Sequence, residues 1–224
     1  VPRIAFINKM DRVGADFNAV IDGMRERLGT RPLPIQIPIG LEDSFTGMVD
    51  LVAFKAVVYQ DELGTDYKVV SVPAELVEDA QMARELLVET LADVDEEIME
   101  LYLDGKEVPA ETLKRASRSG TIAMKVVPVL CGSAFKNKGI QLVLDAVVDY
   151  LPSPLDLPSI EGFNPDTNGE TERNPSEDEP FATLAFKLMV APFVGRLVFC
   201  RVYSGRIAAG HTVLNARTGK RERI

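Results

Sequence analysis

Apolar positions at the start of the chain predict a buried strand that leads into an amphipathic helix. Residues 3–7 form an almost continuous apolar run, which is typical of a parallel strand covered on both faces. After a polar loop at 8–15, apolar side chains recur at helical spacing as far as Leu28. Asp16 suits the N-cap of this helix and Gly29 its end. The order of strand, loop and helix is half of a βαβ unit.

Residues 31–124 follow a different pattern, which predicts an α+β insertion. Residues 35–40 alternate as in a half-exposed strand, and a glycine turn at 61–65 predicts a hairpin. Helical spacing then indicates three helices, after which the βαβ pattern resumes with a buried strand and a further helix. We therefore expect 1–30 and 125–154 to form one α/β domain that the insertion interrupts.

The C-terminal part of the chain predicts a linker and then β-structure. Residues 155–180 are rich in Pro, Asn, Glu and Asp and carry few apolar side chains, as at a domain boundary. Residues 181–224 combine alternating apolar positions with closely spaced glycines, which is typical of short antiparallel strands. The expected fold class is thus α/β, with a partial parallel sheet that carries the α+β insertion, followed by the beginning of an antiparallel β-barrel.

The opening of the chain indicates that the parallel sheet is incomplete. The first residue is a valine, and the buried strand begins directly after it, although such a strand needs neighbours and covering helices. We therefore expect that the chain is cut from a longer protein. Unpaired strand edges invite further pairing, so we also expect self-association between copies of this piece.

Composition restricts the function classes. The chain has 46% hydrophobic and 26% charged residues, as in an ordinary soluble protein, and no apolar run approaches the roughly 18 residues of a membrane-spanning helix. Cys131 and Cys200 lie in apolar runs, so we expect free thiols in a reducing cytoplasm. With a single histidine, His211, a zinc centre is not expected. The net charge of −9 argues against nonspecific binding of nucleic acid by the whole surface.

The tetrad Asn8-Lys9-Met10-Asp11 is the strongest candidate for chemistry, because it lies between the first strand and the helix, where open α/β sheets bind their ligands. Guanine presents two adjacent donors, N1–H and the 2-amino group, and one carboxylate can accept from both. Adenine would leave that carboxylate unpaired. Asp11 fits this role, Asn8 can tie the loop together and reach the other edge of the base, and Lys9 can lay its methylene stem across the ring. The alternative is a charged turn that caps a strand.

A second loop comes after the next predicted buried strand, which ends in Cys131-Gly132-Ser133-Ala134-Phe135. The small residues Ser133 and Ala134 let backbone N–H groups approach the guanine O6 without a bulky side chain in between. Ser and Ala are common in loops, so this feature alone indicates little. Together with the tetrad, on the next strand of one sheet, it predicts half of a guanine pocket.

These segments resemble bacterial elongation factor G, a translational GTPase. Residues 1–17 are similar to its guanine-specificity segment, and residues 129–139, with Gly-Ser-Ala-Phe-Lys-Asn-Lys-Gly, are similar to its second base-contacting loop. The stretch between them resembles the large insertion in the GTPase domain of that family. Residues 181–224 resemble the start of the following β-barrel domain. The resemblance implies the C-terminal part of a P-loop GTPase-type domain, its insertion, and a truncated barrel.

The resemblance also implies a site that reads the base of GTP or GDP. The implied guanine-binding residues are Asn8, Lys9, Asp11, Ser133, Ala134 and Phe135. In the intact cytoplasmic protein, GTP hydrolysis with Mg²⁺ would control the movement of tRNA and mRNA through the ribosome. The implied partners are ribosomal RNA and ribosomal proteins, including a stalk protein that meets the insertion. The acidic helices predicted at 74–104 are a candidate surface for that stalk protein.

The parts that handle phosphate are missing from the sequence. It contains no Gly-x-x-x-x-Gly-Lys-Ser/Thr loop, and the resemblance places the Mg²⁺ ligands and the water-orienting histidine upstream of Val1. His211 lies in a turn, and we expect a structural or surface role for it. Because phosphoryl transfer depends on stabilising charge at the phosphates, we predict that the isolated chain does not hydrolyse GTP.

Three alternatives stay open at this point. A ribosome-protection factor or a release factor shares the base motif, although the length of the insertion favours elongation factor G. A passive ribosome-binding module would show no guanine preference. A dinucleotide-binding dehydrogenase is disfavoured, because the chain lacks the glycine fingerprint of that class.

Overall fold

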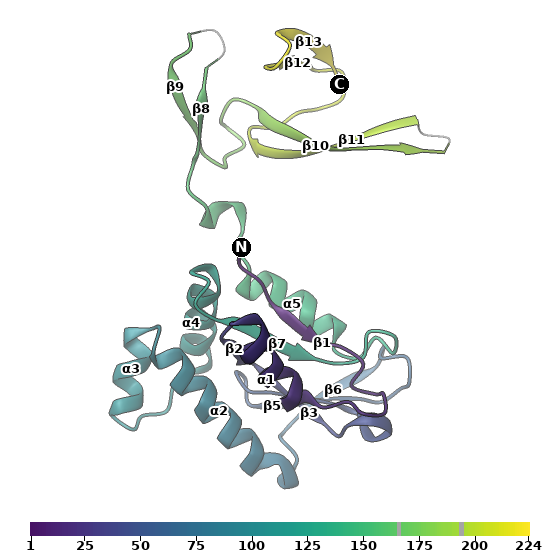
Figure 1. Cartoon of the computed structure of the whole chain (residues 1–224), viewed down its shortest axis with the longest axis vertical. Coiled ribbons are helices and arrows are strands. Elements are labelled where there is room, and N and C mark those ends of the chain that lie inside the picture. The colour runs from purple at the N-terminus through teal and green to yellow at the C-terminus, as the bar shows by residue number, and fades with distance from the viewer. Residues whose placement is uncertain (165–166, 193–194) are drawn as a thin grey trace. The chain divides into compact units, whose positions relative to one another are not determined.

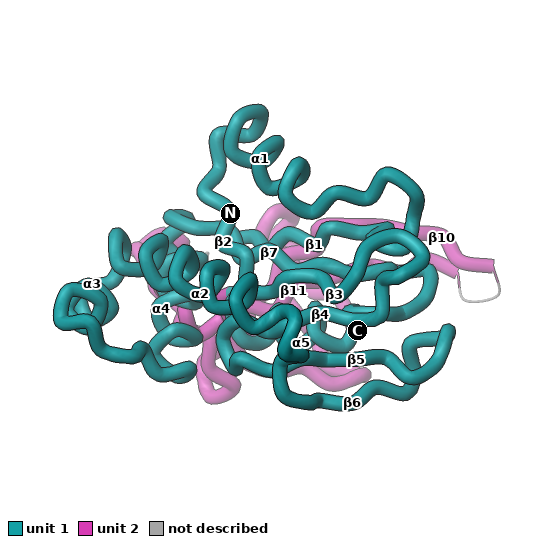
Figure 2. The backbone as a smooth tube through the Cα atoms, turned by 90° about the horizontal axis from the view of Figure 1, so that it is seen from below, with its two compact units in different colours: residues 1–151 teal, residues 152–224 magenta. Residues whose placement is uncertain are grey.

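The computed structural model describes residues 1–164, 167–192 and 195–224. The chain divides into two compact units, Val1–Leu151 and Pro152–Ile224, which Figure 2 distinguishes by colour. The first unit contains a parallel sheet, an antiparallel sheet and helices, whereas the second consists mainly of antiparallel strand pairs. This combination of α/β structure and a following β-rich unit confirms the expected fold class.

The parallel sheet brings together strands that are far apart in the sequence. Its order is β1 (Ala5–Ile7), β7 (Val127–Cys131) and β2 (Pro32–Pro34), and both pairs are parallel. All residues of β7, the central strand, are buried, as a continuous apolar run predicts. The two prolines of β2 interrupt the apolar pattern along the sequence, which therefore does not predict this strand. They are compatible with a strand because β2 has one partner in this sheet, so that one side of it needs no N–H donors.

Helices α1 (Phe17–Leu28) and α5 (Ile140–Tyr150) pack through side chains that alternate along β7. Phe17 of α1 lies in one core cluster with Val129, whereas Tyr150 of α5 lies in another with Leu130. Figures 1 and 2 show the two helices on different sides of this sheet. Helix α1 begins and ends as predicted. The Asp16 carboxylate accepts from the N–H of Ala19 at 2.9 Å, and Gly29 closes the helix with φ +59°.

The insertion contains a four-stranded antiparallel sheet, which we call the insertion sheet. Its strands lie in the order β3, β4, β5 and β6, and each pairs with the next one along the chain. Their bounds are Gln36–Ile39, Gly47–Asp50, Lys55–Tyr59 and Tyr67–Val70, with the short 3₁₀ helix η1 (Glu42–Ser44) between the first two. The apolar pattern from Met48 to Tyr59 predicts one continuous strand-like stretch, but a turn divides it into β4 and β5. The Asp50 carboxylate stabilises this turn by accepting from the N–H groups of Val52 and Ala53.

Three further helices of the insertion, which helical spacing predicts, bury apolar side chains in the core. They are α2 (Val77–Ala92), which comes after the 3₁₀ helix η2 (Ala74–Leu76), α3 (Glu96–Leu103) and α4 (Ala110–Ile122). The side chains that they bury include Leu87, Leu91, Ile98 and Leu113. Leu87 and Leu91 lie one helical turn apart, so that they face the core from the same side of α2.

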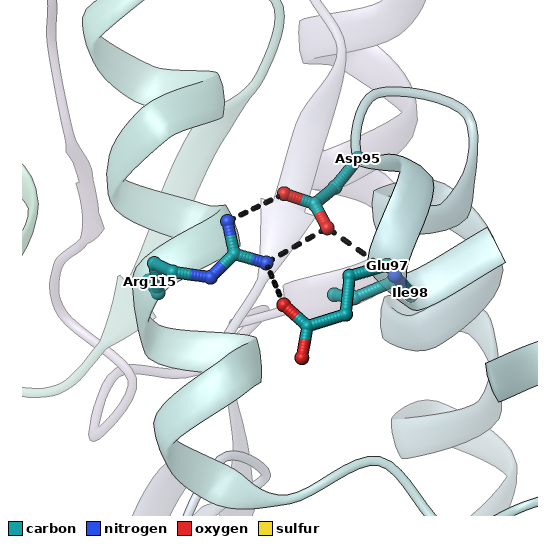
Figure 3. A network of polar contacts seen from close by, with 4 residues as sticks. All are labelled: Asp95, Glu97, Ile98 and Arg115. Carbon is teal, nitrogen blue, oxygen red and sulfur yellow. Dashed lines mark hydrogen bonds and ion pairs between the residues drawn. The ribbon is translucent and has the colours of Figure 1, made fainter. Parts of the chain in front are cut away.

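A network of polar contacts joins α3 to α4 (Figure 3). The Asp95 carboxylate caps α3 by accepting from the N–H of Ile98 at 3.2 Å. It also accepts two hydrogen bonds from Arg115 of α4, at 2.8 and 2.9 Å, and Arg115 donates to Glu97 at 2.9 Å. The hydrogen bonds from Arg115 lower the pKa of Asp95 below its ordinary value of 3.8, although burial opposes this shift.

The second unit begins with the 3₁₀ helix η3 (Pro154–Asp156), and its described residues continue as three antiparallel pairs. The pairs are β8 with β9 (Ile160–Phe163, Glu170–Arg173), β10 with β11 (Ala182–Ala191, Gly195–Ser204) and β12 with β13 (Thr212–Asn215, Lys220–Arg223). The first pair lies where sequence analysis expects a linker. Its strands contain several polar and charged residues, so that hydrophobic alternation did not reveal them.

Candidate functional site

The candidate site lies where β1 and β7 end. Because the strands are parallel and Ile7 pairs with Cys131, the loops that come after them leave the same edge of the sheet. We call residues 8–16 the first loop and residues 132–139 the second loop. Backbone hydrogen bonds join them, from the N–H of Gly132 to the carbonyl of Ile7 at 3.0 Å and from the N–H of Met10 to the carbonyl of Gly132 at 3.1 Å. The side chain of Met10, 1% exposed, anchors the first loop in the core.

Asn8 links the two loops through its side chain. Its Oδ1 accepts from the N–H of Lys9 at 2.7 Å and from the N–H of Ala134 at 2.9 Å. The Ser133 N–H is also engaged, because it donates to the carbonyl of Lys138 at 2.9 Å. Sequence analysis expects the N–H groups of this Ser-Ala pair to face a base. In this structure they hold the loops together instead, and the amide Nδ2 of Asn8 is the donor group at the end of the same side chain.

Asp11 lies beside the second loop as an almost covered carboxylate. Its side chain is 8% exposed, and its Oδ2 lies 3.6 Å from the Nζ of Lys136, whose side chain is 41% exposed. Burial by itself raises the pKa of Asp11, but the hydroxyl of Ser133, a backbone N–H and the ammonium of Lys136 outweigh it and hold this pKa below 3.8. Asp11 is therefore ionised near neutral pH, so it presents acceptors for hydrogen bonds.

Comparison with known proteins decides the family. The family described as elongation factor Tu GTP binding domain matches residues 1–153, and this match contains both loops. The chain belongs to this family. It is also similar to a protein from Thermus thermophilus whose crystal structure is known, with a TM-score of 0.76 and 27% sequence identity. That similarity covers 100% of this chain and 30% of the Thermus thermophilus chain, so this chain spans less than a third of that protein's length.

As a member of the elongation factor Tu GTP-binding domain family, the chain belongs with the translational GTPases, and guanine nucleotides are the expected ligands of such a domain. The two remaining candidate residues lie at the open rim of the site. Lys9 is exposed and adopts a left-handed backbone conformation with φ +66°. Phe135 is 92% exposed. The structure therefore brings Asn8, Asp11 and the Ser-Ala pair together, whereas Lys9 and Phe135 flank them without packing against the core.

No metal centre accompanies this site in the part of the chain that the structure describes, where no three His, Cys, Asp or Glu side chains gather closely enough to hold an ion. His211 belongs to the second unit. Nor is any helix within the described ranges long and apolar enough to cross a bilayer.

Residues of the insertion that no sequence motif marks contact one or the other of the two loops. They are Glu42 on η1, Tyr59 on β5 and Gly64 in the turn between β5 and β6. Their positions in the sequence, 28 to 80 residues from their partners, carry no motif that would have revealed them. Short polar turns such as those that contain Glu42 and Gly64 are common in proteins, so their sequences alone do not predict these contacts.

Proposed function

We propose that this chain carries the guanine-reading half of the nucleotide site of a ribosome-dependent GTPase of the elongation factor G type. The observation that carries the proposal is the hydrogen bond of 2.9 Å from the Ala134 N–H to the Asn8 Oδ1, which joins the loop that carries the Asp11 carboxylate to the loop that carries Ser133. Two acceptor-bearing side chains from one loop thus lie against the small residues of the other. This arrangement suits a flat base with donors on one edge.

The base is read mainly through the carboxylate. The N1–H and the 2-amino group of guanine donate to Asp11, and the Nδ2 of Asn8 donates to the opposite edge of the base. The contact between Lys136 and Asp11 is an ion pair of 3.6 Å at a partly exposed rim, so replacing it by two base donors costs little. Lys9 covers one face of the ring with its methylene stem, and Phe135 contributes an apolar surface on the other side.

We infer the elongation factor G type from the segment that follows each loop along the chain. The insertion between the loops, with its own sheet and three helices, and the β-rich unit after α5 both support an elongation factor G-type protein. In that intact protein, GTP hydrolysis would drive the movement of tRNA and mRNA on the ribosome in the cytoplasm. Ribosomal RNA and proteins are its partners, and a stalk protein docks on the insertion, where α2 and α3 carry acidic side chains in their first turns.

The phosphates and Mg²⁺ are handled by residues outside this chain, because its sequence contains no Gly-x-x-x-x-Gly-Lys-Ser/Thr loop. The residues at hand fit the base but not the phosphates. The isolated chain is therefore expected to lack GTP hydrolysis, while the full-length protein hydrolyses GTP when ribosomes are present.

Titration calorimetry tests the proposal. The full-length protein is expected to bind GDP more tightly than ADP by a factor on the order of 10⁴, because adenine leaves the Asp11 carboxylate unpaired. Equal affinities for the two nucleotides would refute guanine reading by these loops. In a parallel assay of phosphate release, ribosome-stimulated GTP hydrolysis by the full-length protein supports the translational type, and a rate that ribosomes leave unchanged contradicts it.

A further inference from the structure

The connection between strands β3 and β4 of the insertion sheet contacts the first loop through Glu42. The N–H of Glu42 donates to the carbonyl of Met10 at 2.8 Å, and its Oε1 accepts from the N–H of Gly14 at 2.6 Å. Glu42 lies in η1, between β3 and β4, and adopts a left-handed backbone conformation with φ +56°. Such a conformation is costly for a residue other than glycine, and here it directs the backbone N–H and the carboxylate of one residue toward the same loop.

The same sheet contacts the second loop through Tyr59. This residue ends β5, its side chain is 6% exposed, and its hydroxyl accepts from the N–H of Gly139 at 2.7 Å. The hydroxyl also donates to the Oε1 of Gln141 at 3.0 Å. Gly139 comes directly after Lys138, whose backbone closes the second loop on Ser133 by hydrogen bonds of 2.9 and 3.0 Å. Tyr59 therefore holds the base of the loop on which Ser133 and Ala134 lie.

Gly64 adds a third contact, in the turn after β5. Its carbonyl accepts from the side chains of Asn137 at 3.2 Å and Gln141 at 2.9 Å. Gly64 has φ +63°, and a Cβ atom at this position would lie 2.4 Å from the carbonyl oxygen of Lys136. The turn thus packs directly on the backbone of the second loop, where only glycine fits.

Both loops are therefore held by one rigid element. Strand β4 pairs with β3 on one side and β5 on the other, so that η1 and Tyr59 are fixed relative to each other by ladder hydrogen bonds. Figure 1 shows this sheet beside the parallel sheet. Glu42 fixes the loop that carries Asp11, and Tyr59 fixes the loop that carries Ser133. The insertion thus connects the two loops a second time, in addition to the hydrogen bonds that join them directly.

We propose that Glu42 and Tyr59 are positioning residues for guanine specificity, through which the insertion sets the spacing of the two base-reading loops. This inference rests on the proposed function and names what controls it. Neither side chain touches the base. Their hydrogen bonds instead keep the Asp11 carboxylate and the Ser133–Ala134 segment at the distance that guanine requires, and sub-ångström loosening of such a site weakens discrimination.

The test measures the preference for GDP over ADP in the full-length protein, as the ratio of the two dissociation constants. Tyr59→Phe removes the hydroxyl and leaves the ring in the core, while Glu42→Ala removes the acceptor for Gly14. Each is expected to lower the GDP preference by about fivefold, the equivalent of about one hydrogen bond. Glu42→Gln keeps a side-chain carbonyl oxygen in place and is expected to restore most of the preference.

Tyr67→Phe is the matched control. Tyr67 lies on the neighbouring strand β6, and the centre of its ring is 5.6 Å from the centre of the Tyr59 ring. This variant is expected to keep the wild-type ratio. The inference is wrong if Tyr59→Phe lowers the melting temperature but both Tyr59→Phe and Glu42→Ala keep the wild-type ratio of dissociation constants. Both residues would then have structural roles only, and the proposed function would stand. A wild-type protein without guanine preference would overturn the proposed function, and this inference with it.

Discussion

Replacement of Asp11 by Asn tests base reading with little change in the packing of this residue. Asparagine has the size of aspartate and keeps one side-chain oxygen, so the packing of a side chain that is 8% exposed is preserved. Its Nδ2, however, donates where the carboxylate accepts. On the proposed function, this group then faces the 2-amino donor of guanine. It suits xanthine instead, which carries a carbonyl at the same ring position.

The magnitude is set by the two hydrogen bonds that the carboxylate makes to guanine. A hydrogen bond to a charged group contributes about 1.5–3 kcal/mol, and an unsatisfied buried donor costs about 1–3 kcal/mol. The N1–H keeps a neutral acceptor, whereas the 2-amino group loses its own and meets a donor. The expected loss is about 4 kcal/mol, which is on the order of 10³-fold in the Kd for GDP. The affinity for xanthosine diphosphate is expected to rise by on the order of 10²-fold.

Competition calorimetry with GDP and xanthosine diphosphate on the full-length protein measures both changes. Asp22→Asn is the control, because it makes the same chemical change in an exposed ion pair with Arg25 on α1. It is expected to leave both affinities unchanged. If Asp11→Asn folds with a wild-type melting temperature and still prefers GDP by the wild-type ratio, the carboxylate does not read the base and the reasoning is refuted.

Two further predictions concern stability. Asp95→Ala removes both the cap of α3 and the ion pair with Arg115. Its free energy of unfolding, measured in urea, is expected to fall by about 2 kcal/mol. Asp95→Asn keeps a capping side chain, so its free energy of unfolding should fall by about half of that. Since the folded-state pKa of Asp95 lies below 3.8, its contribution is complete above the unfolded pKa and is lost as the pH falls through the folded pKa. Equal pH profiles of stability for wild type and Asp95→Asn across this acidic range contradict the assignment. Gly64→Ala is expected to lower stability by about 2–4 kcal/mol from backbone strain and overlap, while Gly105→Ala, with φ +65° and open space, should cost only about 1 kcal/mol. If thermal unfolding shows the same loss of stability for Gly64→Ala and Gly105→Ala, the chain relieves the overlap at Gly64 and this prediction is wrong.

The sequence was informative wherever local chemistry decides structure. The β1–α1 and β7–α5 segments could be predicted from apolar runs, an N-capping Asp16 and a terminal Gly29, because these signals act within a few residues. The juxtaposition of the two loops was also predictable, since parallel strands end at one edge of a sheet. The sequence pattern therefore predicts the fold class and the proximity of Asn8 to Ala134.

The features that lay beyond that reasoning depend on contacts between distant segments. β2 escaped notice because prolines hide a strand that has one partner. The pairing of Ser133 and Ala134 N–H groups with Lys138 and Asn8 was not foreseen, because competition for a donor is settled only when all acceptors are in place.

The separation of the two loops along the chain has a consequence for folding. Asn8 and Ala134 are 126 residues apart, so their encounter carries a large entropic cost of ring closure. The hairpins of the insertion sheet join neighbouring segments and form at far lower cost. Once they have formed, the intervening chain is compact and its ends are already drawn toward each other. We therefore expect the insertion to form early and the loops at 8–16 and 132–139 to be among the last parts of the first unit to order.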